Sequence, residues 1–185
     1  NGLSFTRYSK APILNLTNRE PYSILTAPYV LKHKSKWLMW YVSCEEWVNA
    51  NYPIYNIKFA ISKDGLNWNQ PGKVCIDLKS NERAVARPFV YIENKLFKMF
   101  YCYEKNVGDY KIGYAESKNG IKWIRKDSYA GIHKSKKKND WDSQMIEYPH
   151  LIFHKGKMFM LYNGNNYGKD GFGLAINNEK KKNSL

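Results

Sequence analysis

A segment of about sixty residues is repeated three times along the chain. The prolines near the start of the copies, Pro28, Pro88 and Pro149, are separated by 60 and 61 residues. After each proline come a short apolar run, a turn and a run rich in aromatic residues. These second runs span residues 37–41, 97–101 and 158–162. A repeat of this length indicates a modular fold in which each copy is one supersecondary unit that packs against its neighbours.

Each copy reads as a set of β-strands. Its apolar runs are short, rich in Tyr, Phe, Trp, Val and Ile, and interrupted by turn residues. Residues 93–95 and 154–157 separate paired runs and predict tight hairpins between the first two strands. An Asp-Gly or Asn-Gly pair then turns the third strand into a fourth strand led by tryptophan, at residues 64–68 and 119–123. Four antiparallel strands per copy, arranged radially, predict an all-β fold of the β-propeller class.

The expected domain is a partial propeller over residues 1–185, with about three four-stranded blades present. Residues 1–6 match the turn segments at 64–68 and 119–123, so we expect them to be the last strand of a preceding blade. Propellers typically have about 4 to 8 blades, and the chain is therefore expected to be a fragment with further blades upstream. The blades are expected at approximately residues 22–78, 83–140 and 144–178.

The composition is that of a folded domain, with 43% hydrophobic and 16% aromatic residues. No run of about 18 apolar residues occurs, so we expect no membrane span. Cys44, Cys75 and Cys102 form no Cys-x-x-Cys motif. We expect them to be buried thiols in a reducing compartment, which favours a cytoplasmic location, and we expect no metal and no other cofactor.

The net charge of +14 raises the question of nucleic-acid binding. The lysines are spread through turns and strands, so nucleic acid is not the expected partner. The densest cluster, Lys134 and residues 136–138, falls between the second and third copies. If this cluster faces a ligand, it favours an anionic one.

The antiparallel order places the start of each first strand beside the end of the second strand. Polar residues at these two places are therefore expected on one face, around the axis, and Asp64 and Asn119 on the opposite face as turn residues. Carboxylates, amides, an arginine and flat rings on the axial face suit a carbohydrate, because rings stack on C–H faces and polar groups bind hydroxyls. Arg87 either contacts this ligand or forms an ion pair with Glu104 across its hairpin. The candidate binding residues are Arg87, Glu104, Trp141, Asp142, Gln144, His150, Asn163 and Asn165.

Residues 141–151, with 160–165 and 171–175, resemble the closing part of five-bladed glycosidase-like propellers, similar to glycoside hydrolase families 32, 43 and 130. The resemblance implies hydrolysis or phosphorolysis of a glycosidic bond, with an acid on one side and a second carboxylate as base or nucleophile. It also implies roughly two missing blades upstream. Glu147 matches the acid of the family's Glu-Xaa-Pro motif and is the candidate catalytic residue. Ala27 and Arg87 stand where families 32 and 43 would place aspartates.

The sequence therefore predicts a carbohydrate-active, glycosidase-like propeller that acts on a sugar linkage as a hydrolase or phosphorylase. Its expected partner is a carbohydrate or glycoconjugate, with an anionic one favoured by the basic charge. The alternative is a non-catalytic propeller that binds glycan or serves as a protein-interaction platform. A basic nucleic-acid binder is the third interpretation, and it predicts an affinity that falls steeply with salt.

Overall fold

The computed structural model describes residues 2–177, and this part of the chain is built of β-strands. The helical segments in this range are two single turns of 3₁₀ helix, η1 (Asp127–Tyr129) and η2 (Asn166–Gly168). No helix in this range is long and apolar enough to span a membrane. The predicted all-β fold is confirmed.

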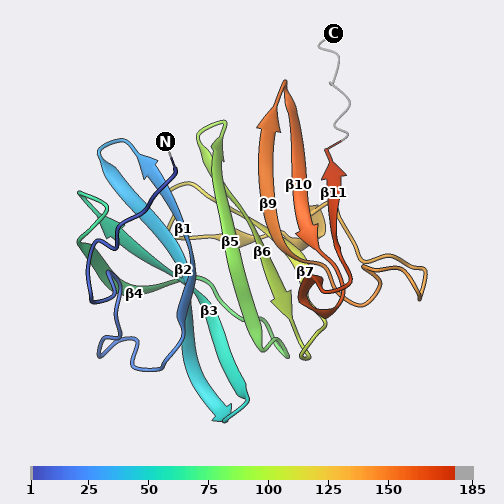
Figure 1. Cartoon of the computed structure of the whole chain (residues 1–185), viewed down its shortest axis with the longest axis horizontal. Helices are drawn as coiled ribbons and strands as arrows, with labels where there is room; N and C mark the ends of the chain where they lie inside the picture. Colours follow the sequence, from blue (N-terminus) through green and yellow to red (C-terminus); the bar gives the residue numbers. More distant parts are fainter. Residues whose placement is uncertain (1, 178–185) are drawn as a thin grey trace.

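The strands form three units that lie in chain order across the molecule (Figure 1). A parallel contact between Tyr55 and Ala84 joins the first two units into one sheet, and the third unit is a separate sheet. The first unit contains β1 (Leu25–His33), β2 (Lys36–Asn49), β3 (Tyr52–Ser62) and β4 (Trp68–Ile76). The second contains β5 (Ala84–Glu93), β6 (Leu96–Glu104), β7 (Lys111–Ser117) and β8 (Ile124–Arg125). The third contains β9 (Glu147–His154), β10 (Lys157–Asn163) and β11 (Phe172–Ile176). Consecutive strands within each unit pair antiparallel, which confirms the predicted hairpins.

The units pack against one another through shared apolar clusters. Trp40 of β2 is fully buried, and its indole N–H donates a 2.7 Å hydrogen bond to the carbonyl of Gly120 in the second unit. Its ring also contacts those of Phe97 and Trp123. A second cluster joins the second and third units, with Phe89, Phe100, Ile146, Leu151 and Met160 among its members. Burying this apolar surface between units stabilises each of them, because a single hairpin or unit could not bury it alone.

The two Asp-Gly and Asn-Gly turns repeat one hydrogen-bond pattern. Asp64 Oδ1 accepts from the backbone N–H groups of Leu66 and Asn67, both at 2.8 Å. Asn119 Oδ1 accepts from the corresponding groups of the second unit, at 3.0 and 2.9 Å. The hydrogen bonds to Asp64 hold the pKa of its carboxyl below the usual range, because they favour the charged form. Both residues are therefore turn residues, as predicted.

Each unit opens with a bulge in its first strand. Ala27, Arg87 and Tyr148 stand directly before the three prolines and have φ values of 48°, 52° and 55°. The strand register shifts at the same places. The left-handed region is sparsely populated by residues other than glycine, so the three bulges are strained in the same way. The residues that precede the bulges are Thr26, Ala86 and Glu147.

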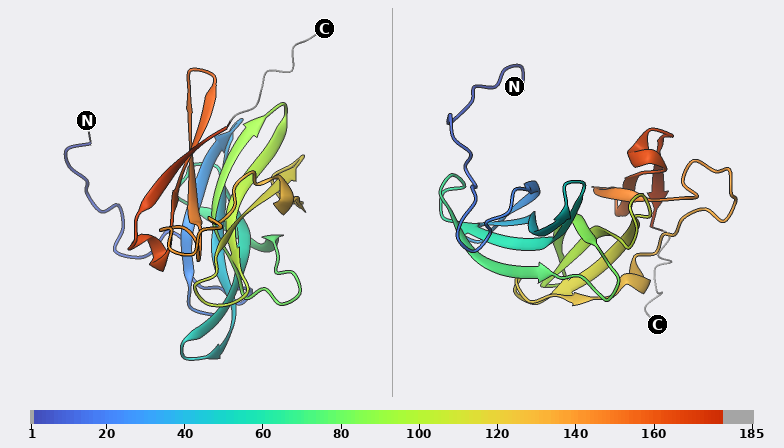
Figure 2. Two further views of the ribbon diagram at one scale, coloured as in Figure 1. Left: turned by 90° about the vertical axis from the view of Figure 1, so that its right-hand side faces the viewer. Right: turned by 90° about the horizontal axis from the view of Figure 1, so that it is seen from below.

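The N-terminal segment extends from the first unit without joining a strand, as the dark blue trace of Figure 2 shows. Its apolar side chains Leu3, Phe5 and Tyr8 are exposed. The assignment of residues 1–6 to a preceding blade stays a prediction, and residue 1 lies outside the described residues, as does residue 178 of the expected third blade. A closed propeller of five blades likewise stays a prediction.

Candidate functional site

The starts of β1, β5 and β9 and the ends of β2, β6 and β10 define one face of the molecule, here called the bulge face. The strand register places Leu25 opposite Ser43 in the first unit and Ala84 opposite Glu104 in the second. In the third unit Glu147 lies opposite Asn163. The predicted juxtaposition of strand starts and strand ends is therefore present. The Asp-Gly turns lie at the other end of the strands, because Trp37 at the start of β2 pairs with Ser62.

Glu147 is a buried carboxyl group without a described hydrogen-bond partner. Its exposed fraction is 0%, and neither Oε1 nor Oε2 has a hydrogen-bond partner of normal distance and angle in residues 2–177. Burial raises the pKa of this carboxyl to about 7, while Tyr148 and the charge of Arg87 act in the opposite direction. A carboxyl that titrates near neutral pH is suited to donate or accept a proton in a reaction.

Arg87 lies beside Glu147 on the bulge face. Its side chain is exposed, and its guanidinium carbon lies 4.5 Å from the centre of the Tyr148 ring. No carboxylate of residues 2–177 lies within ion-pair distance of it. Arg87 is thus held by a cation–π contact with Tyr148, and none of its guanidinium N–H groups is paired with a carboxylate of residues 2–177.

The alternative pairing of Arg87 with Glu104 is wrong, because Glu104 pairs with Arg83. The Arg83 guanidinium donates to Glu104 Oε1, and the Gly108 N–H donates to Oε2 at 3.0 Å. Arg83 also donates to the Pro53 carbonyl at 3.0 Å. Both charged side chains are buried, so each neutralises the other inside the fold. Glu104 is therefore engaged in the structure by Arg83 and Gly108, and its assignment as a ligand contact stays a prediction.

Cys102, Tyr55 and Tyr110 belong to one apolar cluster with Tyr148, the residue that follows Glu147. The Cys102 thiol is fully buried and accepts a 2.9 Å hydrogen bond from the Tyr148 N–H. The hydroxyls of Tyr55 and Tyr110 lie 2.6 Å apart, and the Tyr110 carbonyl accepts from the Ile146 N–H at 3.0 Å. Two of these residues have a sequence signal. Tyr148 is the middle residue of the Glu-Xaa-Pro motif, and the spacing of the repeat predicts Cys102 near the end of β6. Nothing local in the sequence indicates the Tyr55–Tyr110 pair.

The loop before β9 is fastened to the loop after β10 by side chains that were expected to bind substrate. Trp141 stacks on Tyr162 at 5.5 Å, and a Cβ placed on Gly164 would lie 2.4 Å from the Trp141 ring. Asp142 accepts a 3.0 Å hydrogen bond from the Tyr162 hydroxyl. Asn165 accepts from the N–H groups of Gln144 and Met145 and donates to the Asp140 carbonyl, at 2.7, 3.2 and 3.0 Å. Trp141, Asp142 and Asn165 therefore hold the loops together.

The remaining candidates are more open. The Asn163 amide donates to the Tyr167 carbonyl at 3.4 Å, and Asn163 is half-buried beside Glu147 in the strand pairing. Gln144 and His150 are exposed, and the His150 ring lies 5.0 Å from that of Phe89. Asn163, Gln144 and His150 thus keep polar atoms that a ligand can reach. Their assignment as substrate contacts stays a prediction.

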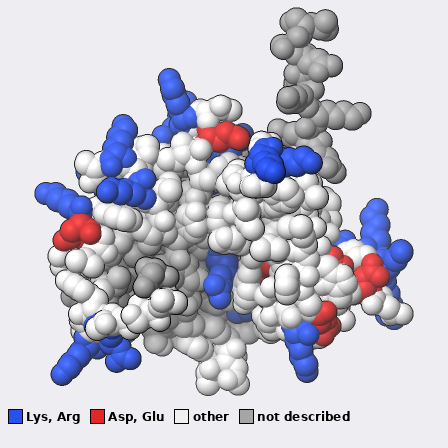
Figure 3. Space-filling model, turned by 45° about the horizontal axis from the view of Figure 1, so that its top comes forward, with Lys and Arg blue, Asp and Glu red and all other residues white. Residues whose placement is uncertain are grey.

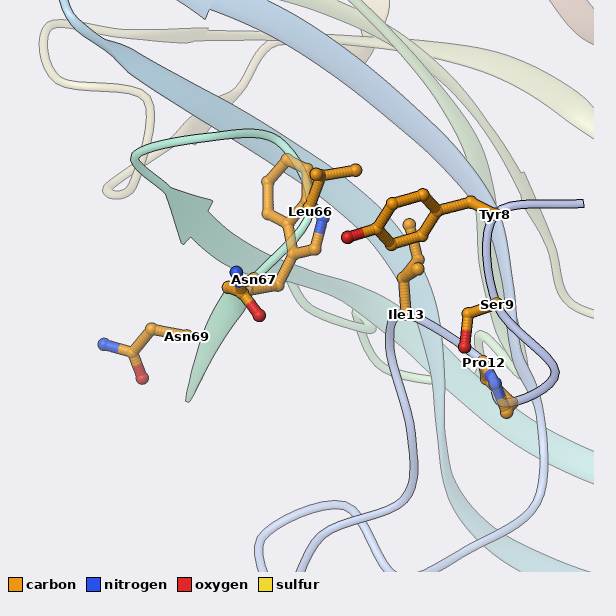
Figure 4. Close-up of a pocket in the computed structure, with 8 residues that line it drawn as sticks. Tyr8, Ser9, Pro12, Ile13, Leu66, Asn67 and Asn69 are labelled. Carbon is orange, nitrogen blue, oxygen red and sulfur yellow. The ribbon is translucent and has the colours of Figure 1, made fainter.

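Two pockets have linings that do not include Glu147. A pocket of about 680 Å³ separates the N-terminal segment from the turn at 66–69, with Tyr8 and Ile13 on one side and Leu66 and Asn67 on the other (Figure 4). It lies at the Asp-Gly end of the first unit. A second pocket of about 340 Å³ lies between β7 and the 127–134 segment, and its lining includes Ile146.

The charged groups of residues 2–177 form no metal site, and the basic groups on the face shown in Figure 3 form no single patch. No group of three or more His, Cys, Asp and Glu residues in this range is arranged to hold a metal ion. Lys and Arg side chains are spread over the face shown in Figure 3, with acidic side chains among them. Cys44, Cys75 and Cys102 are free, buried thiols, which confirms their predicted burial.

Comparison with known sequences gives relatives of unassigned activity. No family model matches the chain. The uncharacterized protein Rv1502 of Mycobacterium tuberculosis H37Rv is 36% identical over 177 residues, which cover 95% of this chain and 58% of that protein. MT1551 of the CDC 1551 strain of that organism matches with the same identity and coverage. The chain therefore spans about 58% of the length of the curated relatives it matches.

Comparison with solved structures gives glycoside hydrolases. A family 117 glycoside hydrolase of Zobellia galactanivorans, Zg3597, has a TM-score of 0.71 at 20% identity, over 88% of this chain and 55% of that one. Another glycoside hydrolase has a TM-score of 0.69 at 18% identity, over 90% and 50%. The Bombyx mori family 32 β-fructofuranosidase BmSUC1 has a TM-score of 0.60 at 14% identity, over 80% of this chain and 32% of that one. This likeness shows the fold, so the chain has a glycosidase-like, all-β architecture.

Proposed function

We propose that the bulge face binds a carbohydrate or glycoconjugate and that the protein acts on a glycosidic bond, with Glu147 as general acid. The observation that carries this proposal is the Glu147 carboxyl, buried and without a described hydrogen-bond partner at the start of β9. Leaving a polar group in that state costs stability, and such groups are retained where a ligand or a reaction uses them. The glycosidase-like fold supports the proposal of this chemistry.

In the proposed reaction, Glu147 protonates the leaving oxygen of the scissile bond. Below pH 7 its carboxyl holds the proton that this step requires, because burial raises its pKa to about 7. Departure of the protonated oxygen leaves positive charge on the sugar ring, and a water molecule or phosphate then attacks the anomeric carbon. Asn163 and His150, whose polar atoms are accessible, are the proposed hydroxyl contacts beside it.

The second candidate function is a propeller that binds glycan, or a protein partner, without catalysis. One observation favours it. The residues equivalent to Glu147 in the first two units are Thr26 and Ala86, so these positions supply one carboxylate and not the pair that glycoside hydrolysis ordinarily uses. If the proposed enzyme is correct, the second carboxylate comes from another position or from another part of the whole protein. The proposal of an enzyme therefore includes a catalytic base in further blades.

A sugar screen that records two signals separates the two functions. The intact protein is mixed with neutral, acidic and phosphorylated sugars and with 4-methylumbelliferyl glycosides, and thermal stability and product release are followed together. Stabilisation with product supports the enzyme. Stabilisation without product supports the binding module, and the absence of both for every sugar contradicts the carbohydrate proposal.

The cytoplasm is the proposed location, because all three cysteines are free and buried and so need no oxidising compartment. Cell fractionation of the native host with an antibody against the intact protein tests this. Recovery with the secreted fraction would contradict it.

A further inference from the structure

Arg87 is a charged group whose structural surroundings leave its hydrogen-bonding edge unused. The other two arginines beyond the N-terminal segment, Arg83 and Arg125, both form ion pairs within the structure. Arg83 pairs with Glu104, and Arg125 donates to Glu82 at 2.7 and 3.0 Å and to Asp127 at 3.1 Å. Arg87 has no such partner among the described carboxylates, although it lies on an element of the core.

The position of Arg87 is fixed on three sides. Its neighbours in the chain, Ala86 and Pro88, are buried, and its own backbone has a φ of 52°. The Tyr148 ring supports the guanidinium at 4.5 Å. The left-handed region costs any residue other than glycine free energy, and the equivalent positions of the first and third units are occupied by Ala27 and Tyr148. Stability alone therefore does not require an arginine here.

We propose that the carbohydrate bound on the bulge face carries a carboxylate or phosphate group, and that Arg87 binds this anion through its N–H edge beside Glu147. This inference rests on the proposed function, because it names the class of sugar that the same site takes. A guanidinium presents parallel N–H donors that match two oxygens of a carboxylate or phosphate. The Tyr148 ring lies 4.5 Å from the guanidinium carbon, and no described carboxylate takes the N–H donors, so these donors remain for the ligand.

The titratable groups around Arg87 are neutral at mildly acidic pH, so the positive charge of Arg87 is not compensated by them. The titratable side chains that face it are Glu147 and Tyr148 of β9 and Cys102 of β6. Burial raises the pKa of the Cys102 thiol and of the Tyr148 phenol, so both are neutral at pH 7. Burial also raises the pKa of Glu147, which is protonated at mildly acidic pH. At such pH, Arg87 is the one charge in this group, and an anionic ligand meets no opposing carboxylate.

The test compares sugars that differ only in the anionic group. Isothermal titration calorimetry at pH 6 measures the affinity of the intact protein for D-galacturonic acid against D-galactose, and for D-glucose 6-phosphate against D-glucose. Inorganic phosphate is the control for the bare anion. The variants are Arg87→Gln, which removes the charge, and Arg87→Lys, which keeps the charge but lacks the parallel N–H donors of a guanidinium. Arg19→Gln is the matched control, because Arg19 is an exposed arginine of the N-terminal segment.

At least one acidic sugar is expected to bind roughly tenfold to a hundredfold more tightly than its neutral counterpart, as charge-assisted hydrogen bonds allow. Arg87→Gln should remove this preference, Arg87→Lys should keep part of it, and Arg19→Gln should leave it unchanged. Thermal melting of each variant checks that it is folded.

Equal binding of neutral and acidic sugars by the wild type, or a preference that survives Arg87→Gln in folded protein, would overturn the inference and leave the proposed function standing. Inorganic phosphate that binds as tightly as the sugar phosphate would also overturn it. Absence of binding by every sugar would overturn the inference and the proposed function together.

Discussion

The second and third units each bury one glutamate on the bulge face, and the two differ in what surrounds them. Glu104 at the end of β6 has an arginine and a backbone N–H as partners. Glu147 at the start of β9 is equally inaccessible to solvent, with exposed fractions of 1% and 0%, and has no described hydrogen-bond partner. The arginine nearest to it, Arg87, lies exposed against Tyr148.

This difference means that the Glu104 carboxylate is compensated within the fold, whereas burial of the Glu147 carboxyl lowers the stability of the fold. A buried charge that is paired is compensated, and removing one partner of such a pair is strongly destabilising. A buried carboxyl without a partner remains neutral over a wider pH range and is available for proton transfer. Glu104 and Glu147 should therefore respond in opposite ways to the same substitution.

The largest expected effect is on catalysis. Glu147→Gln should lower kcat on a sugar that the screen identifies as substrate by roughly 10²-fold to 10⁴-fold, because the amide cannot donate the proton to the leaving oxygen. Affinity for that sugar should change little. Steady-state kinetics and calorimetry on the same preparation measure the two quantities, and unchanged turnover would remove Glu147 from the catalytic role.

The matched substitution at Glu104 should act on stability. Glu104→Gln leaves the buried Arg83 without its counter-charge, so we expect the free energy of unfolding to fall by about 3 kcal/mol or more. Urea denaturation monitored by tryptophan fluorescence measures this. A loss below about 1 kcal/mol would mean that water or another group replaces the carboxylate, and the contrast between the two glutamates would be much weaker.

The pH dependence of stability should reveal the unpaired carboxyl. Glu147 has a pKa of about 7 in the folded chain against an ordinary value of 4.5. Its contribution to stability is fully present below pH 4.5, is lost as the pH rises to 7, and is constant above that. The shift corresponds to about 3 kcal/mol as an upper limit. The free energy of unfolding of wild type, compared with Glu147→Gln from pH 4 to pH 8, should show this loss, and parallel curves would contradict it.

The smallest effect is expected at the opposite end of the strands. Asn119→Ala removes an acceptor for two backbone N–H groups in the turn before β8, and should cost about 1 kcal/mol of stability. Sugar affinity and turnover should not change. Denaturation and the sugar assay on the same variant check both, and a change in turnover would mean that the two ends of the unit are coupled.

The strands and turns followed from the sequence because their signals are local. An Asp-Gly or Asn-Gly pair needs only its own neighbours to form the turn, and the 60-residue repeat transfers the assignment from one unit to the next. The same repeat predicted which strand ends would meet on the bulge face.

The pairing on that face did not follow from the sequence. Arg83 and Arg87 are four residues apart, and the hairpin expected from the sequence offered only Arg87 as a partner for Glu104. The observed register pairs Ala84 with Glu104 and so places Arg83 beside that carboxylate. The strained bulge at Arg87 turns its side chain to Tyr148 of the next unit and leaves Glu104 to Arg83. Local sequence likewise indicates the motif of Glu147 but not its burial, because burial depends on packing between segments that are far apart in the sequence.

The ionisation of Glu147 is the most direct test of this contrast. Carboxyl-labelled ¹³C glutamate, assigned with the Glu147→Gln variant, gives the titration midpoint of this one group by NMR. We expect a midpoint near pH 7 in the wild type, and a higher one in Arg87→Gln, because the Arg87 charge lowers the pKa of Glu147. A midpoint near 4.5 in the folded wild type would contradict the account, because it would show that Glu147 is solvated or paired.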